Sequence, residues 1–309
     1  MIQEQEINFQ EIFTLNDEDL IYWALNAKLL KKPSFCKICR NTTGKKVIMK
    51  LIANKNYLDK FIWRCNNKDC GAIENIRNRN NLFGEFPRVK LRILLIFIFT
   101  HFTVMLSPSL SQQILKLNLS LIRRLSNRLS EIIIRRQIEE ENQKGLLGGK
   151  DKVVEMDESC FFKRKNNAGR IQKQIWGFGL VERITGRLFV QIIPNRTAKT
   201  LIAIILKWVS KETRLLLSDE WKAYRSLEDL GFNHKTIKHK DNFVDPNNSE
   251  IHTQNIENRW GIIKGLMKKR GKISRISFDE KIKEIIWRIS YKKNLQKELL
   301  KSLIDDIHS

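Results

Sequence analysis

The strongest constraint on the fold is an ordered series of short apolar segments between residues 152 and 269. Three segments with the composition of strands come first, and a Thr185-Gly186 turn joins the second to the third. The expected strands are 152–162, 174–183, 187–193, 214–218 and 234–238, and the expected helices are 200–209, 222–230 and 256–269. The run at 214–218 is apolar throughout, as in a buried parallel strand. The order βββαβαβα is that of the ribonuclease H-like fold, so the sequence favours an α/β domain with a mixed sheet.

The charge balance narrows the class of partner. The chain carries 57 Lys+Arg against 34 Asp+Glu, a formal net charge of +23. This excess argues against an ordinary neutral metabolic enzyme and favours a polyanionic partner, either nucleic acid or an acidic membrane surface, with a merely soluble basic protein as the plain alternative. The longest apolar run, residues 93–106, is shorter than the roughly 18–20 residues of a membrane span. It predicts a buried helix, and nucleic acid is the favoured partner.

Three carboxylates fall where this order of elements would bring them together. Asp157 lies in the middle of the first expected strand, where aspartate is disfavoured. Asp219 follows the apolar run 214–218, at the end of a strand where open α/β sheets bind ligands. Glu257 lies in the first turn of the last helix. Each has an ordinary alternative: an exposed strand residue, a helix N-cap, and a charge that complements the helix dipole, respectively.

Together these acids suit phosphodiester chemistry. Cleavage by water, or attack by a 3′-hydroxyl, is assisted by two divalent cations roughly 3.5–4 Å apart. Mg²⁺ and Mn²⁺ take oxygen ligands, so Asp157, Asp219 and Glu257 are the predicted ligands. Lys264 follows Glu257 by nearly two helical turns and shares its face, where it is placed to contact a phosphate.

Two basic segments are candidate DNA contacts. The segment 259–275 contains no acid, and its basic residues are Arg259, Lys264, Lys268, Lys269, Arg270, Lys272 and Arg275. Such a run fits a surface that contacts the phosphate backbone. Residues 107–136 predict a short helix, a turn and a longer helix with Ser120 as its N-cap. The longer helix carries Arg123, Arg124, Arg128, Arg135 and Arg136. A solvated basic face is the alternative for both segments.

Four of the five cysteines form a second pattern. Cys36-x2-Cys39 and Cys65-x4-Cys70 are two pairs within one short segment, an arrangement that suits tetrahedral zinc. The alternating stretches between them predict the hairpin of a zinc ribbon, and free buried cysteines are the alternative. Cys160 remains for the core. Because residues 1–15 show no secretory signal, the cysteines indicate a reducing compartment.

At this point the residues carry a family resemblance. VVEMDESCFF (153–162), WGFGLVERITGR (176–187), the segment from LLLSDEWKAY to KTIKH (215–239), NFVDP (242–246) and HTQNIENRWGIIK (252–264) resemble the catalytic domain of ISXO-like insertion-sequence transposases. They are most similar to the related eukaryotic Merlin superfamily. The cysteine segment and the helices after it are similar to the N-terminal part of the same proteins.

The resemblance implies a DDE transposase. Asp157 and Asp219 match its two metal-binding aspartates, Glu257 the third acid, and Lys264 the basic residue after it, with Asn255 as the other candidate for the third position. It implies that the protein cuts transposon ends and joins the 3′-hydroxyl to target DNA. The implied cofactors are Mg²⁺, or Mn²⁺, at the acids and structural Zn²⁺ at the cysteines.

The expected organisation follows from these patterns. GLLGGKDK (145–152) is a glycine-rich break and marks the main boundary. The predicted parts are a helical lead-in (1–32), a zinc ribbon (33–82), a helical DNA-binding segment (83–144), the catalytic domain (150–295) and a helical tail (296–309).

The expected partners are double-stranded DNA, as transposon ends and target, and further copies of the chain in the synapsed state, with no membrane. The nucleus is the expected compartment if the source is eukaryotic, and otherwise the bacterial cytoplasm. Two alternatives remain: a domesticated, catalytically silent DNA-binding protein of the same fold, and a host ribonuclease H-like nuclease.

Overall fold

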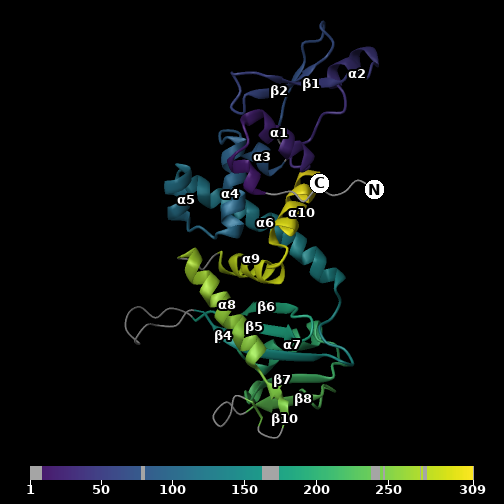
Figure 1. The fold of residues 1–309 in the computed structure, drawn as a ribbon. Coiled ribbons are helices and arrows are strands. Elements are labelled where there is room, and N and C mark those ends of the chain that lie inside the picture. The colour runs from purple at the N-terminus through teal and green to yellow at the C-terminus, as the bar shows by residue number, and fades with distance from the viewer. Residues whose placement is uncertain are drawn as a thin grey trace. The chain divides into compact units, whose positions relative to one another are not determined.

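Figure 1 shows the computed structural model of the chain, which describes residues 9–77, 81–161, 174–237, 244–245, 248–271, 273 and 277–308. The chain divides into two compact units. One comprises Met1–Ile133 together with Lys293–Ser309, and the other is Ile134–Lys292. Within the part described, no helix has the length and apolar character needed to cross a membrane.

The first unit is mainly helical around one small sheet. Its elements are η1 (Phe9–Phe13), α1 (Asp17–Asn26), α2 (Lys37–Thr43), β1 (Met49–Ala53), β2 (Phe61–Cys65), β3 (Ile73–Asn75), α3 (Leu82–Glu85), α4 (Leu91–Thr103), α5 (Pro108–Leu115), the start of α6 (Leu119–Gln143) and α10 (Leu295–His308). The apolar run at 93–106 forms most of α4, whose Leu95 and Phe97 are buried as expected.

The segment between the cysteine pairs forms the expected hairpin. β1 pairs with β2 antiparallel, from Met49 opposite Cys65 to Ala53 opposite Phe61, and β3 adds a third strand on β2. The first cysteine pair lies at the start of the short helix α2, which the strand-like alternation of the sequence did not indicate.

The helix pair after α4 matches the expected short helix, turn and longer helix, with one difference at the cap. The side chain of Asn118 accepts a hydrogen bond from the N–H of Leu121 at 2.7 Å, and Ser120 lies inside α6. The N-cap prediction for Ser120 was therefore wrong, because Asn118 supplies the oxygen that the first turn needs. At the end of the chain, Asp306 of α10 accepts a hydrogen bond from the N–H of Leu82 at 3.2 Å.

The second unit is built on a five-stranded sheet of order β6-β5-β4-β7-β8. Its strands are β4 (Val153–Cys160), β5 (Trp176–Glu182), β6 (Leu188–Ile193), β7 (Leu215–Asp219) and β8 (His234–Ile237). β4, β5 and β6 form an antiparallel meander, whereas β7 and β8 run parallel to β4 on its other side. This topology is that of the ribonuclease H-like fold and confirms the fold class.

Helices cover both faces of this sheet (Figure 1). On one face, α7 (Ala198–Trp208) and the 3₁₀ turn η2 (Lys222–Tyr224) pack on a core that includes Met156, Phe178 and Leu216. On the other face, α8 (Gln254–Arg270) and α9 (Phe278–Ser290) pack on Val181 and Val190. The sequence did not predict α9 or the small hairpin β9 (Val244–Asp245) and β10 (Asn248–His252).

One predicted helix is replaced by turns. Residues 222–230 form η2 followed by turns, with short-range hydrogen bonds such as Leu227 N–H to the Tyr224 carbonyl at 3.1 Å. Tyr224 and Leu227 are both buried in the core beside α7. The segment therefore buries these two side chains without forming the predicted helix.

The glycine-rich break leads directly into the second sheet. Leu147 is fully buried and forms a parallel bridge with Val209. Gly148 has φ +86°, and its N–H donates to Glu182 Oε2 at 2.8 Å. A Cβ at Gly148 would lie 1.9 Å from Thr213 Oγ1, so glycine is required there for both conformation and space.

Candidate active site and metal centre

The central strand brings the two predicted aspartates together. Asp157 lies on β4 opposite Gly179 of β5. On the other side of β4, Val153 pairs with Leu215 and Glu155 with Leu217 of β7. Two residues further along the same register, Asp219 is level with Asp157. Neighbouring strands are about 4.8 Å apart, so the fold itself places these two acids side by side.

The environment of Asp157 opposes its negative charge. The pKa of Asp157 is raised to about 7, chiefly by burial, then by the charge of Asp219 and, less, by that of Glu257. Two hydrogen bonds act in the other direction: the N–H of Glu158 donates to Oδ1 at 2.8 Å, and Trp260 Nε1 donates to Oδ2 at 3.1 Å. Both predicted acids thus lie close enough to Asp157 to affect its ionisation.

The other two acids are half-buried at the ends of their elements. Asp219 closes β7, and its Oδ1 accepts a hydrogen bond from the N–H of Trp221 at 3.0 Å. Glu257 lies in the first turn of α8, and its Oε1 accepts a hydrogen bond from Thr253 Oγ1 at 3.1 Å. The sequence-based positions of all three acids, on β4, at the end of β7 and at the start of α8, match the structure.

A fourth acid, which the sequence did not single out, anchors α8. Glu155 is fully buried and accepts hydrogen bonds from Arg183 Nε at 2.6 Å, Asn255 Nδ2 at 2.7 Å and the N–H of Ile256 at 2.9 Å. Because Glu155 lies two residues before Asp157, it ties the start of α8 to the strand that carries Asp157. It thereby sets the position of Glu257. Asn255, the other candidate for the third position, is instead a partner of Glu155.

A fifth acid was also missed. Glu158 is almost fully buried on the opposite face of β4, where Tyr224 donates a hydrogen bond to it from its hydroxyl. Burial, followed by the charges of Asp219 and Asp157, raises the pKa of Glu158 to about 8. The sequence signal was the Asp-Glu pair inside an apolar strand, since a strand that buries both faces has no place for a second unpaired acid.

The four cysteines converge more tightly than the carboxylates. Among the residues that the structure describes, they are the group of three or more Cys, His, Asp or Glu side chains whose ligand atoms lie within 4.8 Å of one another. The described acids of the second unit do not form such a group, although Asp219 and Glu257 affect the pKa of Asp157.

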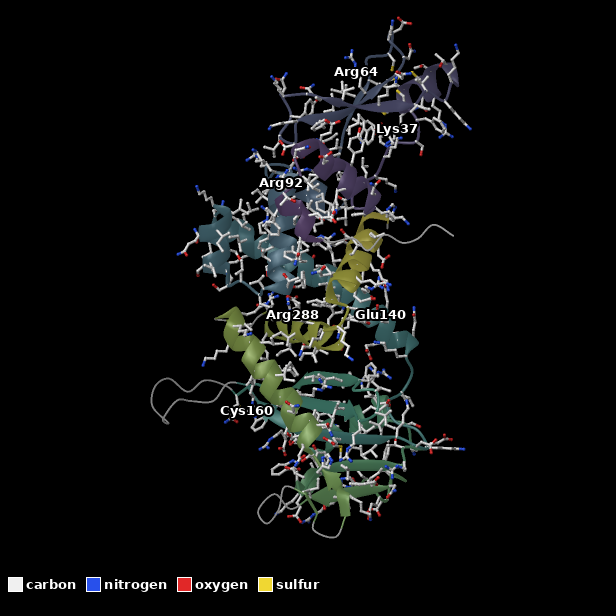
Figure 2. All side chains as sticks on the ribbon, in the orientation of Figure 1. Lys37, Arg64, Arg92, Glu140, Cys160 and Arg288 are labelled. Atoms are coloured by element: carbon white, nitrogen blue, oxygen red, sulfur yellow. The ribbon has the colours of Figure 1, made fainter. Side chains whose placement is uncertain are left out.

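The cysteine geometry fits a tetrahedral zinc ion. The sulfurs of Cys36 and Cys70 are 3.7 Å apart, and those of Cys39 and Cys65 are 3.6 Å apart. Zinc–sulfur bonds of about 2.3 Å give sulfur–sulfur edges of about 3.8 Å in a regular tetrahedron. The N–H of Asn67 donates a hydrogen bond to the Cys65 sulfur at 3.4 Å, which would stabilise a metal-bound thiolate. Figure 2 labels Lys37 and Arg64, which mark the two segments that supply the cysteines.

Most of the predicted basic residues on α8 are exposed. Lys264, Lys268 and Lys269 are exposed, and α8 is unbroken from the third acid to Lys264, so their seven-residue spacing keeps them near one face. Arg270 differs, because its side chain is 8% exposed and forms an ion pair with Glu284 of α9. This placement counts against the DNA contact predicted for Arg270.

The remaining members of that run have separate places. Arg259 is half-buried beside the β5–β6 turn, where its Nη2 would lie 3.1 Å from a Cβ built on Gly186. Lys272 and Arg275 lie outside the described residues, as does most of the NFVDP segment.

The arginines predicted on α6 also differ from one another. Arg123 is exposed. The guanidinium group of Arg124 lies 5.5 Å from the ring centroid of Phe86. Arg128 is paired with Asp306 of α10 through Nη2 at 2.6 Å, within the same unit. Arg128 thus has a packing role, whereas Arg123 presents its charge to solvent.

The fold and the acids at the centre of its sheet define the class: a ribonuclease H-like domain with the acid arrangement of DDE enzymes. Residues 146–290 match the family model of the ISXO2-like transposase domain. This match agrees with the resemblance of the motifs to ISXO-like transposases. The closer likeness to the Merlin superfamily stays a prediction. No curated protein matches the chain.

The chain also has similarity to solved retroviral structures. The HTLV-2 integrase catalytic core domain in complex with magnesium is 16% identical, with a TM-score of 0.31, and the match covers 47% of this chain and 86% of that one. The simian T-cell lymphotropic virus intasome in complex with the PP2A regulatory subunit B56 gamma is 20% identical, with a TM-score of 0.32, and the match covers 47% of this chain and 49% of that one. The BIV integrase catalytic core domain is 18% identical, with a TM-score of 0.30, and the match covers 48% of this chain and 97% of that one. The fold assignment rests on the strand order described above.

The Gly179→Ala variant tests the packing that holds Asp157. A Cβ at Gly179 would lie 2.6 Å from Trp260 Cζ2 and 2.9 Å from Ile256 Cδ1, so α8 has to shift. We expect the free energy of unfolding to fall by about 1–3 kcal/mol, seen as a lower midpoint of thermal unfolding. We also expect slower DNA nicking, because Trp260 moves away from Asp157. Gly261→Ala on the same helix meets no atom within 4 Å and is the matched control, expected to be neutral or stabilising. Equal behaviour of the two variants would contradict this account.

Proposed function

We propose that the chain is a DNA transposase that cuts transposon ends and joins the freed 3′-hydroxyl to target DNA. The observation that carries the proposal is the position of Asp157, Asp219 and Glu257 on three elements of a ribonuclease H-like sheet. The match of residues 146–290 to the ISXO2-like transposase domain supports it.

The acids form a suitable donor set for Mg²⁺ or Mn²⁺. All three offer carboxylate oxygens, the ligands that these hard cations prefer. The pKa of Asp157, raised by burial and by its two neighbours, indicates a repulsion that a divalent cation would relieve. A pair of cations roughly 3.5–4 Å apart, when bound, activates the attacking oxygen and stabilises the leaving one.

The protein's own groups would orient the DNA. Asp157 and Asp219 lie level on adjacent strands and would hold the cations between them, while Glu257 would complete the shell from α8. Lys264, exposed on the same helix, would contact a phosphate next to the acids. Arg123, Lys268 and Lys269, also exposed, would contact the DNA backbone.

The partners and cofactors follow from the same proposal. Double-stranded DNA, as transposon ends and as target, is the substrate, and the net charge of +23 supports a polyanionic partner. Copies of the chain would associate when two ends are synapsed. Zn²⁺ would be structural at the four cysteines. The compartment would be the nucleus of a eukaryotic cell, or the cytoplasm of a bacterial one.

A joining assay separates the proposal from its alternatives. Oligonucleotides copied from the genomic DNA on either side of the coding sequence are incubated with the protein, supercoiled plasmid and Mg²⁺. A transposase joins oligonucleotide 3′ ends to the plasmid, a simple nuclease nicks without joining, and a silent DNA-binding protein binds without either product. Absence of joined product with every flanking oligonucleotide would reject the proposal.

A further inference from the structure

An arginine is held between two tryptophans at the end of the sheet that carries Asp219. The guanidinium carbon of Arg196 lies 3.9 Å from the ring centroid of Trp176 and 4.6 Å from that of Trp221. Trp221 also donates from Nε1 to the Arg196 carbonyl at 3.2 Å. Contact with two aromatic rings restrains the guanidinium group, whose N–H groups can still donate hydrogen bonds.

Arg196 also forms a long ion pair with Glu158, in which its N–H groups donate no hydrogen bond. Arg196 Nη1 lies 4.0 Å from Glu158 Oε2, an ion pair too long for a hydrogen bond. Glu158 is already bonded to the buried hydroxyl of Tyr224. Within the described part of the chain, no hydrogen bond donated by the Arg196 side chain is found, and that side chain is 33% exposed. A planar group with five donors is therefore oriented but not satisfied.

The position links this group to the acids. Trp221 lies two residues after Asp219 and donates its N–H to Asp219 Oδ1 at 3.0 Å. Trp176 pairs with Cys160, three residues after Asp157 on β4. Arg196 follows β6, whose last residue, Ile193, pairs with Trp176. Arg196 therefore lies at the same end of the sheet as Asp219, where β4 and β7 finish.

We propose that Arg196, oriented by Trp176 and Trp221, binds a phosphate group of the DNA strand that enters the acid cluster. The inference rests on the proposed function, since it takes DNA as the ligand. A guanidinium fork matches two phosphate oxygens, and a pre-oriented fork loses less conformational freedom on binding than a free side chain. The cation also offsets the repulsion between a phosphate and the acids beside it.

Binding of DNA without cleavage tests the contact directly. A labelled duplex of about 30 base pairs is titrated with the full chain in Ca²⁺ at several KCl concentrations, and log K is plotted against log [KCl]. For Arg196→Ala we expect the magnitude of this negative slope to decrease by about one, because one phosphate contact is lost. Arg196→Lys keeps the charge but not the fork, so we expect the wild-type slope with binding weakened about 3- to 10-fold.

The matched control is another cation stacked on a tryptophan. Lys207, at the far end of α7, lies 5.3 Å from the ring centroid of Trp208 and is exposed. Lys207→Ala is expected to keep the wild-type slope. In Mg²⁺, Arg196→Ala is expected to raise KM for plasmid nicking about 10-fold with kcat changed less than about 3-fold, the signature of a lost binding contact.

Several results would overturn the inference. A wild-type slope for Arg196→Ala, or the same change in Lys207→Ala, would show that Arg196 does not contact phosphate. A lower midpoint of thermal unfolding in Arg196→Ala with unchanged DNA binding would show a packing role only. If the wild-type chain binds DNA but neither cuts nor joins it, the proposed function fails, while the salt dependence still decides the role of Arg196.

Discussion

The Asp157→Asn variant should lose Mg²⁺-dependent DNA nicking by about 10³-fold or more, equivalent to about 4 kcal/mol of transition-state stabilisation. Asparagine keeps the shape of the side chain and an oxygen for the Trp260 hydrogen bond, but it removes the charge that would hold a cation. Salt-sensitive DNA binding should remain, because it depends on basic residues elsewhere. Nicking rates and binding constants for the same plasmid measure both properties. Nicking at the wild-type rate would show that the active-site assignment is wrong.

The same substitution should stabilise the metal-free protein at high pH. The pKa of Asp157 is raised from 3.8 to about 7, so the folded chain retains a proton that the unfolded chain has lost. Stability of the wild type therefore falls as pH rises from about 4 to about 7 and stays lower above that range. The asparagine of the variant has no charge to bury, and we expect a gain of about 1–4 kcal/mol at pH 8 in EDTA.

Thermal unfolding at pH 5 and pH 8 measures this difference. The gap between variant and wild type should widen at pH 8 and narrow again when Mg²⁺ is added. Asp229→Asn, at an exposed position in the same unit, is the control and should change neither stability nor nicking. A variant that is less stable than the wild type at pH 8 would contradict the effect of burial on Asp157.

The second large effect is expected at the cysteines. Cys39→Ser should abolish stoichiometric zinc binding and unfold the segment around β1, β2 and β3. Structural zinc contributes about 10–16 kcal/mol of apparent binding free energy in zinc-finger peptides, more than so small a sheet gains from its own core. Metal content per chain and limited proteolysis of this segment are the measurements.

Cys160→Ser provides the matched control for that experiment. Cys160 is buried in β4, in the second unit, and is not a member of the four-cysteine group. The variant should bind one zinc ion per chain, as the wild type is expected to do. Wild-type protein without stoichiometric metal, with all four thiols freely titratable, would remove the zinc site.

The sequence predicted the parts of the fold that local patterns determine. The apolar run before Asp219 is typical of a buried strand, and the position of Asp157 inside β4 is unusual enough to indicate function. The spacing of the four cysteines likewise predicted their convergence. In each case a short stretch of sequence carries the signal, because strand burial and metal ligation both restrict residue type strongly.

Long-range pairing determined what the sequence missed. The role of Glu155 depends on α8, a hundred residues later in the chain, and on Arg183 from the turn after β5. Burial of Arg270 depends on Glu284 of α9, which the basic run from 259 to 275 does not reveal. Residues 222–230 have a helical pattern, yet they form η2 and turns beside α7. Such features follow from register and docking, which a single sequence does not specify.

Glu155 and Asp157, two residues apart on β4, have opposite effects on the stability of the metal-free fold. Loss of Glu155 would leave Arg183 without its buried counter-ion and α8 without its anchor, so we expect it to destabilise the fold. Replacement of Asp157 is expected to favour the metal-free fold, so its proposed role in cutting DNA has a cost in stability. A copy of the gene that had been released from selection for that role would be expected to lose Asp157 while Glu155 persisted. In the proposed transposase, selection for DNA cutting would be what preserves Asp157.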